Sequence, residues 1–181
     1  DTAVDSLTHA IEAYVSSKAF EYTDAFALAA MPAIVENVRD ACENPENAEA
    51  RKKLMLAASQ AGMAFSNSSV ALVHGMSRPI GAHFHIAHGL SNAMLLPKIT
   101  EFSVQGNEER YAACARVMKW AHDTDSNASA CSKLVENLFI LNEDLKVPSP
   151  KSLGHIADKK TLKLMASQAL ASGSPQNNPR V

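Results

Sequence analysis

The stretch "HGMSRPIGAHFHIAHGLSNAML", from His74 to Leu95, is the most informative part of this sequence. It places four of the seven histidines within fifteen residues, and residues 66–97 carry almost no charge. His74 directly follows the apolar run "ALV", so its ring is expected to be buried. Because a buried imidazole loses its hydration, it needs a partner inside the protein. The stretch therefore indicates a site built into a folded core.

The rest of the chain predicts helices. With 181 residues and 46% hydrophobic content, the chain is long enough for a substantial core. Sustained apolar and polar alternation and Asn-Gly or Asp-Gly turns are absent from the sequence, which argues against strands. We predict a first helix from about Thr2, then helices over 23–42, 49–65, 107–122, 127–141 and 158–171. The predicted fold class is all-α, a single multi-helix, bundle-like domain over 1–181.

Local sequence signals refine three features of this prediction. Asn44 and Pro45 are typical of the N-cap and first position of a helix, so they are predicted to start the third one. The second half of that helix contains small residues and Met, which favours an interior position. Cys42, Cys114 and Cys131 are widely spaced in apolar helical patterns and are predicted to be buried, reduced thiols.

Composition argues against two kinds of partner. The formal net charge is −2, and lysines and arginines are scattered, so nucleic acid is not expected to bind. No apolar run approaches the roughly 20 residues that a membrane span needs, and no targeting segment precedes the first helix. These features predict a cytoplasmic protein that does not bind membranes.

Asp5 and His9 are the first candidate metal ligands. They lie four residues apart in "VDSLTHAIEAY", residues 4–14, which reads as an amphipathic helix. This spacing brings two side chains onto one helical face, about 5–6 Å apart at Cβ. Both side chains could then reach one ion. Taken alone, however, such a pair is more often a solvated surface pair.

His74 and His88 extend this candidate site. They lie fourteen residues apart, and a glycine follows each of them. Since glycine permits close backbone approach, the two His-Gly steps indicate two segments that meet at one point. Either histidine alone is better explained as a core residue bonded to a backbone carbonyl. Together with Asp5 and His9 they form a set of three imidazoles and one carboxylate, which is the composition of a metal site.

Imidazole and carboxylate ligands without thiolates suit borderline ions such as Fe²⁺ or Zn²⁺. Four protein ligands could close a structural site, or an ion that expands its coordination could also accept a substrate oxygen. The residue types leave both readings open.

These motifs resemble a known family, the iron-containing, or group III, alcohol dehydrogenases. "TAVDSLTHAIEAYVS", residues 2–16, resembles the metal-binding helix of that family. The segment 74–97 resembles its long histidine signature, with the fourteen-residue interval intact, and "ASGSPQNNPR", residues 171–180, is similar to its closing segment. The resemblance covers essentially the whole chain.

The resemblance implies the C-terminal, all-helical domain of the dehydroquinate synthase-like fold that this family shares. The family's N-terminal α/β domain, which binds the dinucleotide, is absent from this chain, and the sequence has no Gly-rich loop after a strand. We therefore expect 1–181 to be part of a longer two-domain enzyme, inactive alone and homo-oligomeric when complete.

The resemblance also implies an activity. It predicts a metal-dependent, NAD(P)-linked alcohol dehydrogenase or aldehyde reductase that acts on small alcohols or aldehydes. The cofactors are Fe²⁺ or Zn²⁺, and NAD or NADP held through the missing N-terminal domain. Phe65 matches an aromatic position near the nicotinamide. The four metal ligands of the family match Asp5, His9, His74 and His88.

One position departs from the family pattern. Four residues after His74 the family commonly has a second histidine that relays the alcohol proton, and this chain has Arg78. A guanidinium cannot act as the base. The relay then falls to His83, His85 or a water chain, although both histidines also fit packing roles. Arg78 would either hold a carboxylate or phosphate of the substrate or pair with a neighbouring acid.

Two alternatives to this activity stay open at this point. The same four ligands could hold a structural Zn²⁺ in a helical module that binds a protein. Alternatively, the chain could come from a relative that acts on a hydroxy acid, a polyol or a phosphonate aldehyde.

Overall fold

The computed structural model describes residues 1–154 and 157–180, and every regular element within these ranges is a helix. The predicted all-α fold class is therefore confirmed. The helices are α1 Thr2–Val15, α2 Glu21–Glu43, α3 Ala48–Asn67, α4 Leu72–Phe84, α5 His88–Ser103, α6 Glu108–Val117, α7 Asn127–Asp144 and α8 Lys159–Ala171, with 3₁₀ turns η1 Val104–Gly106 and η2 Ser174–Asn177.

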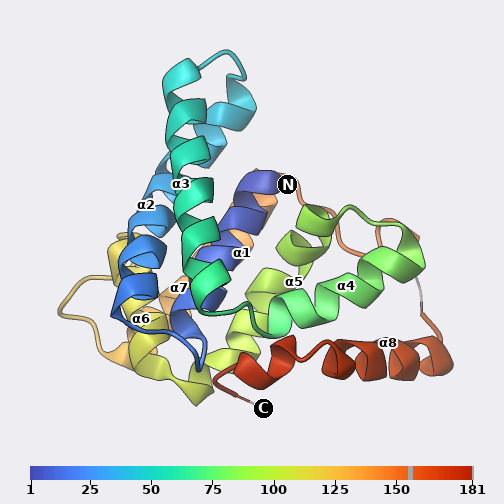
Figure 1. Ribbon diagram of the computed structural model, residues 1–181. Helices are drawn as coiled ribbons and strands as arrows, with labels where there is room; N and C mark the ends of the chain where they lie inside the picture. Colours follow the sequence, from blue (N-terminus) through green and yellow to red (C-terminus); the bar gives the residue numbers. More distant parts are fainter. Residues whose placement is uncertain (155–156, 181) are drawn as a thin grey trace.

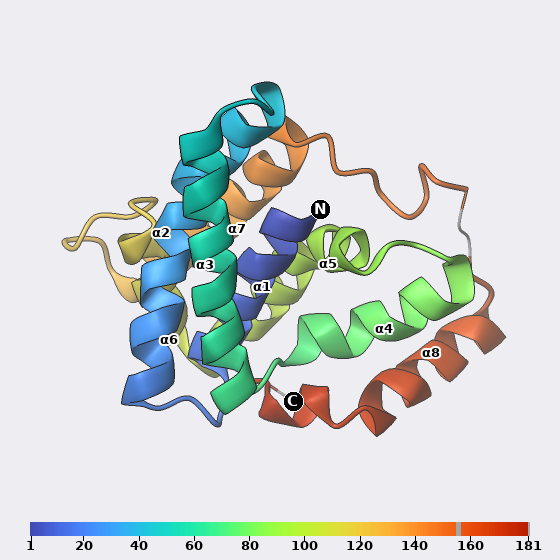
Figure 2. The same ribbon diagram turned by 45° about the horizontal axis from the view of Figure 1, so that its top comes forward.

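Helix α1 lies at the centre of the domain. It packs against α2 and α3 on one side and against α5 on another, and both views show it enclosed by other helices (Figures 1 and 2). Its side chains are buried nearly all round, with Leu7 and Ile11 completely buried. A helix that is buried on all faces is a core helix. The polar side chains of α1 after its first residue are therefore buried or partly buried in the domain.

Helices α2 and α3 form a long antiparallel hairpin (Figure 1). Ala57, Ala61 and Ala64 on α3 are completely buried, because small residues at helical spacing let helices approach closely. Met63, in contrast, is 42% exposed. The prediction that this half of α3 is interior is thus right for one face and wrong for the other.

Helices α4, α5 and α8 form the other end of the domain. α4 and α8 lie side by side in both views (Figures 1 and 2). Between α4 and α5 the chain reverses at His85, which adopts the left-handed conformation with φ 55°. The turn η2 packs on Gly75, where an added Cβ would lie 2.7 Å from Cγ of Pro175. At Gly89 an added Cβ would instead lie 3.2 Å from the carbonyl carbon of Asp1, so each of the two glycines makes room for a different segment.

The predicted N-cap of α3 is wrong by three residues, whereas the predicted range 49–65 begins one residue after the observed start at Ala48. Asn44 ends α2, since its N–H still bonds the Asp40 carbonyl, whereas the side chain of Asn47 accepts from the Ala50 N–H and caps α3. The turn 44–47 thus contains two asparagines that suit a cap, and only the second one caps α3. Among the described helices, none combines the length and apolar character that crossing a membrane requires.

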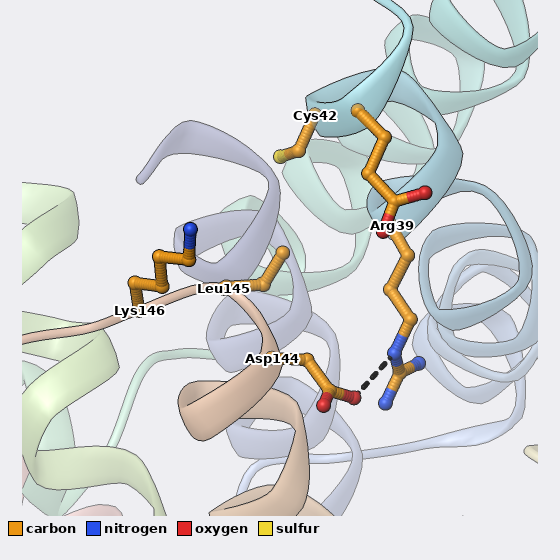
Figure 3. Close-up of a pocket in the computed structure, with 6 residues that line it drawn as sticks. Arg39, Cys42, Asp144, Leu145 and Lys146 are labelled. Atoms are coloured by element: carbon orange, nitrogen blue, oxygen red, sulfur yellow. Dashed lines mark hydrogen bonds and ion pairs between the residues drawn. The ribbon is translucent and has the colours of Figure 1, made fainter.

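The cysteines divide between core and surface. Cys114 and Cys131 are buried and unpaired, as predicted, whereas Cys42 is exposed, and that prediction is wrong. Cys42 lies at the end of α2, where the helix runs past the core. It lines a pocket of about 540 Å³ between the ends of α2 and α7, beside the ion pair of Arg39 with Asp144, 2.7 Å long (Figure 3).

Candidate metal centre

The structure brings together four side chains that the sequence singled out. Each offers one ligand atom, and these four atoms all lie within 4.8 Å of one another. We call this group the ligand cluster; it consists of Asp5, His9, His74 and His88. Helix α1 contributes the first two, one turn apart on one face, while α4 and the first residue of α5 contribute the others.

The geometry of the ligand cluster fits a small divalent ion. Ligand atoms that surround Zn²⁺ tetrahedrally at about 2.1 Å lie about 3.4 Å from one another. Oδ1 of Asp5 lies 3.4 Å from Nε2 of His74 and 3.8 Å from Nε2 of His88. Nitrogen and carboxylate oxygen donors suit borderline ions such as Zn²⁺ and Fe²⁺. The set needs only a small contraction to enclose such an ion.

Stacked rings hold His9 in place. Its ring lies between those of Phe65 and His74, with centroid distances of 4.2 and 4.4 Å and interplanar angles of 20° and 22°. Phe65 comes from the end of α3, so this helix closes one side of the ligand cluster. The pKa of His9 is lowered to about 4, mainly by burial and secondly by the charge of His74. His9 is therefore neutral at physiological pH, the form in which imidazole binds metals.

Exposure changes across the ligand cluster. The side chain of His74 is 3% exposed and that of Asp5 16%, whereas that of His88 is 50% exposed. The cluster is thus closed on the α4 side and open beside His88. A closed structural site would be shielded on every side, whereas the ligand cluster of this chain reaches solvent beside His88.

The acidic neighbours concentrate positive charge on His74. Burial opposes its protonation, but hydrogen bonds with Asp5 and Glu12 outweigh burial and raise the pKa of His74 to about 8. The pKa of Asp5 is lowered: burial acts to raise it, and the bonds with His74 and Asn92 together with the charge of His9 prevail. This environment favours a positive charge, which a divalent ion would supply.

Glu12 supports the ligand cluster and was missed by the sequence analysis. Its Oε2 lies 2.6 Å from Nδ1 of His74, and its Oε1 accepts from the backbone N–H of Val73 at 2.5 Å. The side chain is buried at 3% exposure. Its signal in the sequence was a single acidic residue in the apolar segment "AIEAYV", three residues after His9.

Asn92 is the second residue that the sequence analysis missed. Its Nδ2 donates to Oδ1 of Asp5 at 2.6 Å and lies 3.1 Å from Nε2 of both His74 and His88. The residue is completely buried, and its Oδ1 has no hydrogen-bond partner. The only available signal was its position on α5, one turn after His88. The amide nitrogen thus lies among the ligand atoms themselves, in contact with three of the four.

The other candidate residues lie outside the ligand cluster. Arg78 is exposed one turn after His74, and its guanidinium donates to Oγ of Ser174 at 2.8 Å. Among the described residues no carboxylate lies within ion-pairing distance of Arg78, so the expected pairing with a neighbouring acid is not found. His83 is exposed, and its Nε2 lies 2.9 Å from Oε1 of Gln168 on α8. His85 is exposed in the turn.

Comparison with known proteins identifies relatives over the whole chain. The model of the Fe-containing alcohol dehydrogenase family, C-terminal, matches residues 1–181. 1,3-Propanediol dehydrogenase of Citrobacter freundii is 34% identical over 99% of this chain and 46% of its own length. Lactaldehyde reductase of Escherichia coli K12 is 35% identical over 99% and 46% of the two chains.

Solved structures agree with this result. The crystal structure of a 1,3-propanediol oxidoreductase matches with a TM-score of 0.94 and 34% identity, over 99% of this chain and 47% of that one. The chain thus spans about half the length of the curated relatives that it matches.

Proposed function

Because the chain belongs to the iron-containing alcohol dehydrogenase family and matches its C-terminal part, we propose that it is the metal-binding half of a metal-dependent, NAD(P)-linked alcohol dehydrogenase or aldehyde reductase. The observation that carries the proposal is the meeting of one carboxylate and three imidazoles from three helices. The open side of the ligand cluster favours a catalytic ion over a purely structural one.

The ligand cluster would hold Fe²⁺ or Zn²⁺. A divalent ion there would polarise the alcohol or carbonyl oxygen during hydride transfer. Asp5 reduces the net positive charge of the site, and the neutral rings of His9, His74 and His88 keep the ion electrophilic. His9, fixed between two stacked rings, and His74, fixed by Glu12, preorganise the site before substrate arrives.

The cofactor site would be shared with a segment outside this chain. We propose that an N-terminal α/β domain binds the phosphates of NAD or NADP and that the nicotinamide reaches the ligand cluster beside Phe65. This ring stacks on His9 and is only partly buried, so it presents an apolar edge next to the metal position. That the relatives are about twice as long supports a second domain. The proposal includes a homo-oligomer of the complete enzyme.

The alcohol proton needs a route that does not involve Arg78. His83 is engaged with Gln168 on α8, which leaves its ring less available. We propose that the proton leaves through water on the open side beside His88. His85, exposed in the adjoining turn, would accept it at a ring nitrogen.

Arg78 favours an anionic substrate. Its guanidinium has the Ser174 hydroxyl as a partner and no described carboxylate near it, so most of its donors face solvent. Arg78 follows His74 by one helical turn, about 5–6 Å at Cβ. A short aldehyde with a carboxylate or phosphonate could reach the ligand cluster with its carbonyl and the fork of Arg78 with its anion. This favours a hydroxy acid or phosphonate aldehyde over a polyol.

Metal removal tests the activity. In the complete protein, NAD(P)H oxidation by a short aldehyde should disappear after chelation and return with Fe²⁺ or Zn²⁺. A complete enzyme that stays fully active without metal would overturn the proposal. If chelation lowered the melting temperature and left turnover unchanged, the ion would be structural, as the alternative reading holds.

Arg78→Ala tests the substrate class. The variant should lose about 10–100-fold in kcat/KM for succinic semialdehyde, in line with a lost charge-assisted bond of about 1.5–3 kcal/mol, and little for butanal. Arg39→Ala is the matched control, since Arg39 is also partly exposed and lies at the pocket between α2 and α7. Equal losses for the anionic and neutral aldehydes would contradict the anion role.

A further inference from the structure

Glu12 occupies an unusual position behind the ligand cluster. The carboxylate is buried in the central helix, and its two oxygens serve two adjacent residues of α4: Oε1 accepts from the Val73 N–H at 2.5 Å, and Oε2 lies 2.6 Å from Nδ1 of His74. Asp5, His9 and Glu12 follow one another by four and three residues on one face of α1. One helix face therefore carries two candidate ligands and the carboxylate behind a third.

We propose that Glu12 is a positioning residue of the metal centre, whose carboxylate accepts the Nδ1–H of His74 and thereby reserves the Nε2 lone pair for the cation. A neutral imidazole has one donor and one acceptor nitrogen, and the partner of one fixes the role of the other. Nε2 is the nitrogen that faces Oδ1 of Asp5, at 3.4 Å. The inference rests on the proposed metal-binding function.

The second contact of Glu12 places the helix as well as the ring. Val73 lies in the first turn of α4, where backbone N–H groups lack partners within the helix and the helix dipole favours a negative charge. The same carboxylate thus fixes the start of α4 on α1 and the tautomer of His74. A shift of α4 would disturb the contacts of Glu12 with Val73 and His74 together. Glu12 therefore fixes the orientation of the His74 ring relative to α1, which carries Asp5 and His9.

A Glu→Gln exchange separates this role from a simple capping role. The amide keeps the size of the side chain, but its one oxygen can accept from only one of the two donors, and its NH₂ then faces the other donor. If Glu12 only capped α4, the amide oxygen would bond Val73 and metal affinity would not change. If Glu12 sets the tautomer, His74 loses the acceptor that keeps its proton on Nδ1.

Zinc binding to the purified protein tests the proposal. With Zn²⁺ alone as the probe and a competing chelator, Glu12→Gln should weaken binding by about 10–100-fold, the usual cost of losing a partner of a metal ligand. Thr8→Val is the matched control. Among the described residues this buried hydroxyl on the same helix bonds the Val4 carbonyl alone, and its loss should leave zinc affinity within about twofold. A folded Glu12→Gln protein with unchanged zinc affinity would overturn the proposal.

A measurement on the unmodified protein covers the case in which Glu12→Gln does not fold. In ¹⁵N spectra of the zinc-saturated protein, the proton of His74 should sit on Nδ1 and exchange slowly, with Nε2 unprotonated. A proton on Nε2 would contradict the inference. Failure of the proposed function gives a different result: the unmodified protein would bind no zinc. If the unmodified enzyme is active and its Glu12→Gln variant binds zinc normally, only the role of Glu12 is overturned.

Discussion

Two pairs of histidines from one stretch of sequence have different surroundings. His74 and His88 lie in the ligand cluster, whereas His83 contacts α8 and His85 occupies the exposed turn. All four lie within fifteen residues of similar composition. What separates them is the supporting structure: buried Glu12 and Asn92 contact the first pair, and the second pair has no buried acidic or amide partner among the described residues. The two histidines of the ligand cluster are thus distinguished by contact with buried polar side chains, Glu12 and Asn92.

Replacing one histidine of each pair with alanine should give the largest difference in zinc affinity. His74→Ala removes a ligand and leaves Glu12 buried without its partner ring, so zinc affinity should fall by at least about 1000-fold, or 4 kcal/mol. His83→Ala should change zinc affinity by less than about twofold, because its ring is exposed and bonds the exposed Gln168. Competition titration measures both. Similar losses in the two variants would remove the distinction between the pairs.

The glycines next to these residues provide a structural test. In Gly75→Ala the new Cβ would lie 2.7 Å from Cγ of Pro175, so η2 must shift, at a cost of about 1–3 kcal/mol. Gly62→Ala, in α3 with no atom within 4 Å of the new Cβ, should instead stabilise by about 0.5–1 kcal/mol. Urea unfolding at constant pH compares the two. A neutral Gly75→Ala would show that the close approach beside His74 is not needed.

The pH dependence of zinc binding should identify His74 as the titrating ligand. Its pKa in the ion-free protein is raised to about 8, and that of His9 is lowered to about 4, so near neutrality His74 still carries a proton that zinc must displace. Affinity should rise with pH, by up to about tenfold per unit below pH 8, and then level off. His83→Ala should leave this profile unchanged. A flat profile between pH 6 and 8 would contradict the assignment.

The same raised pKa has the opposite consequence for stability. Protonated His74 stabilises the ion-free fold fully below its unfolded pKa of 6.5, and this contribution is lost as the pH rises through about 8. The loss is at most about 2 kcal/mol, from a shift of roughly 1.5 units. Thermal melting of the ion-free protein between pH 6 and 9 measures it.

The smallest effect is expected at His85. His85→Asn retains a residue type that tolerates the left-handed conformation, so the turn should persist and zinc affinity should stay within about twofold. If His85 accepts the alcohol proton, turnover in the complete enzyme should fall by several-fold and recover in part with added imidazole. A full rate without rescue would leave water alone as the route.

The sequence was sufficient to predict the helical fold and the four members of the ligand cluster, because both leave local marks: helical spacing of apolar residues, and metal-ligand residue types at set intervals. Glu12 and Asn92 left weaker signals, a single acidic residue in an apolar segment and a position one turn after His88. Their roles arise only where α1 crosses α4 and α5, a relation between segments about 60 to 90 residues apart. Cys42 was misjudged for a similar reason, since its own stretch of sequence does not show that the end of α2 is exposed.

The reversal at His85 has a consequence for insertions and deletions. Three residues connect the two helices: His85, which is left-handed, then Ile86 and Ala87. This short connection sets the direction in which the side chains at the start of α5 point relative to α4. One residue added to α5 just after His88 would rotate this ring by about 100° relative to the rest of the helix. Asn92, one turn further on, would then face away from it. We expect insertions and deletions to be tolerated in the 146–154 loop and to disrupt the ligand cluster between α4 and α5. The number of residues between His74 and His88 should therefore be fixed.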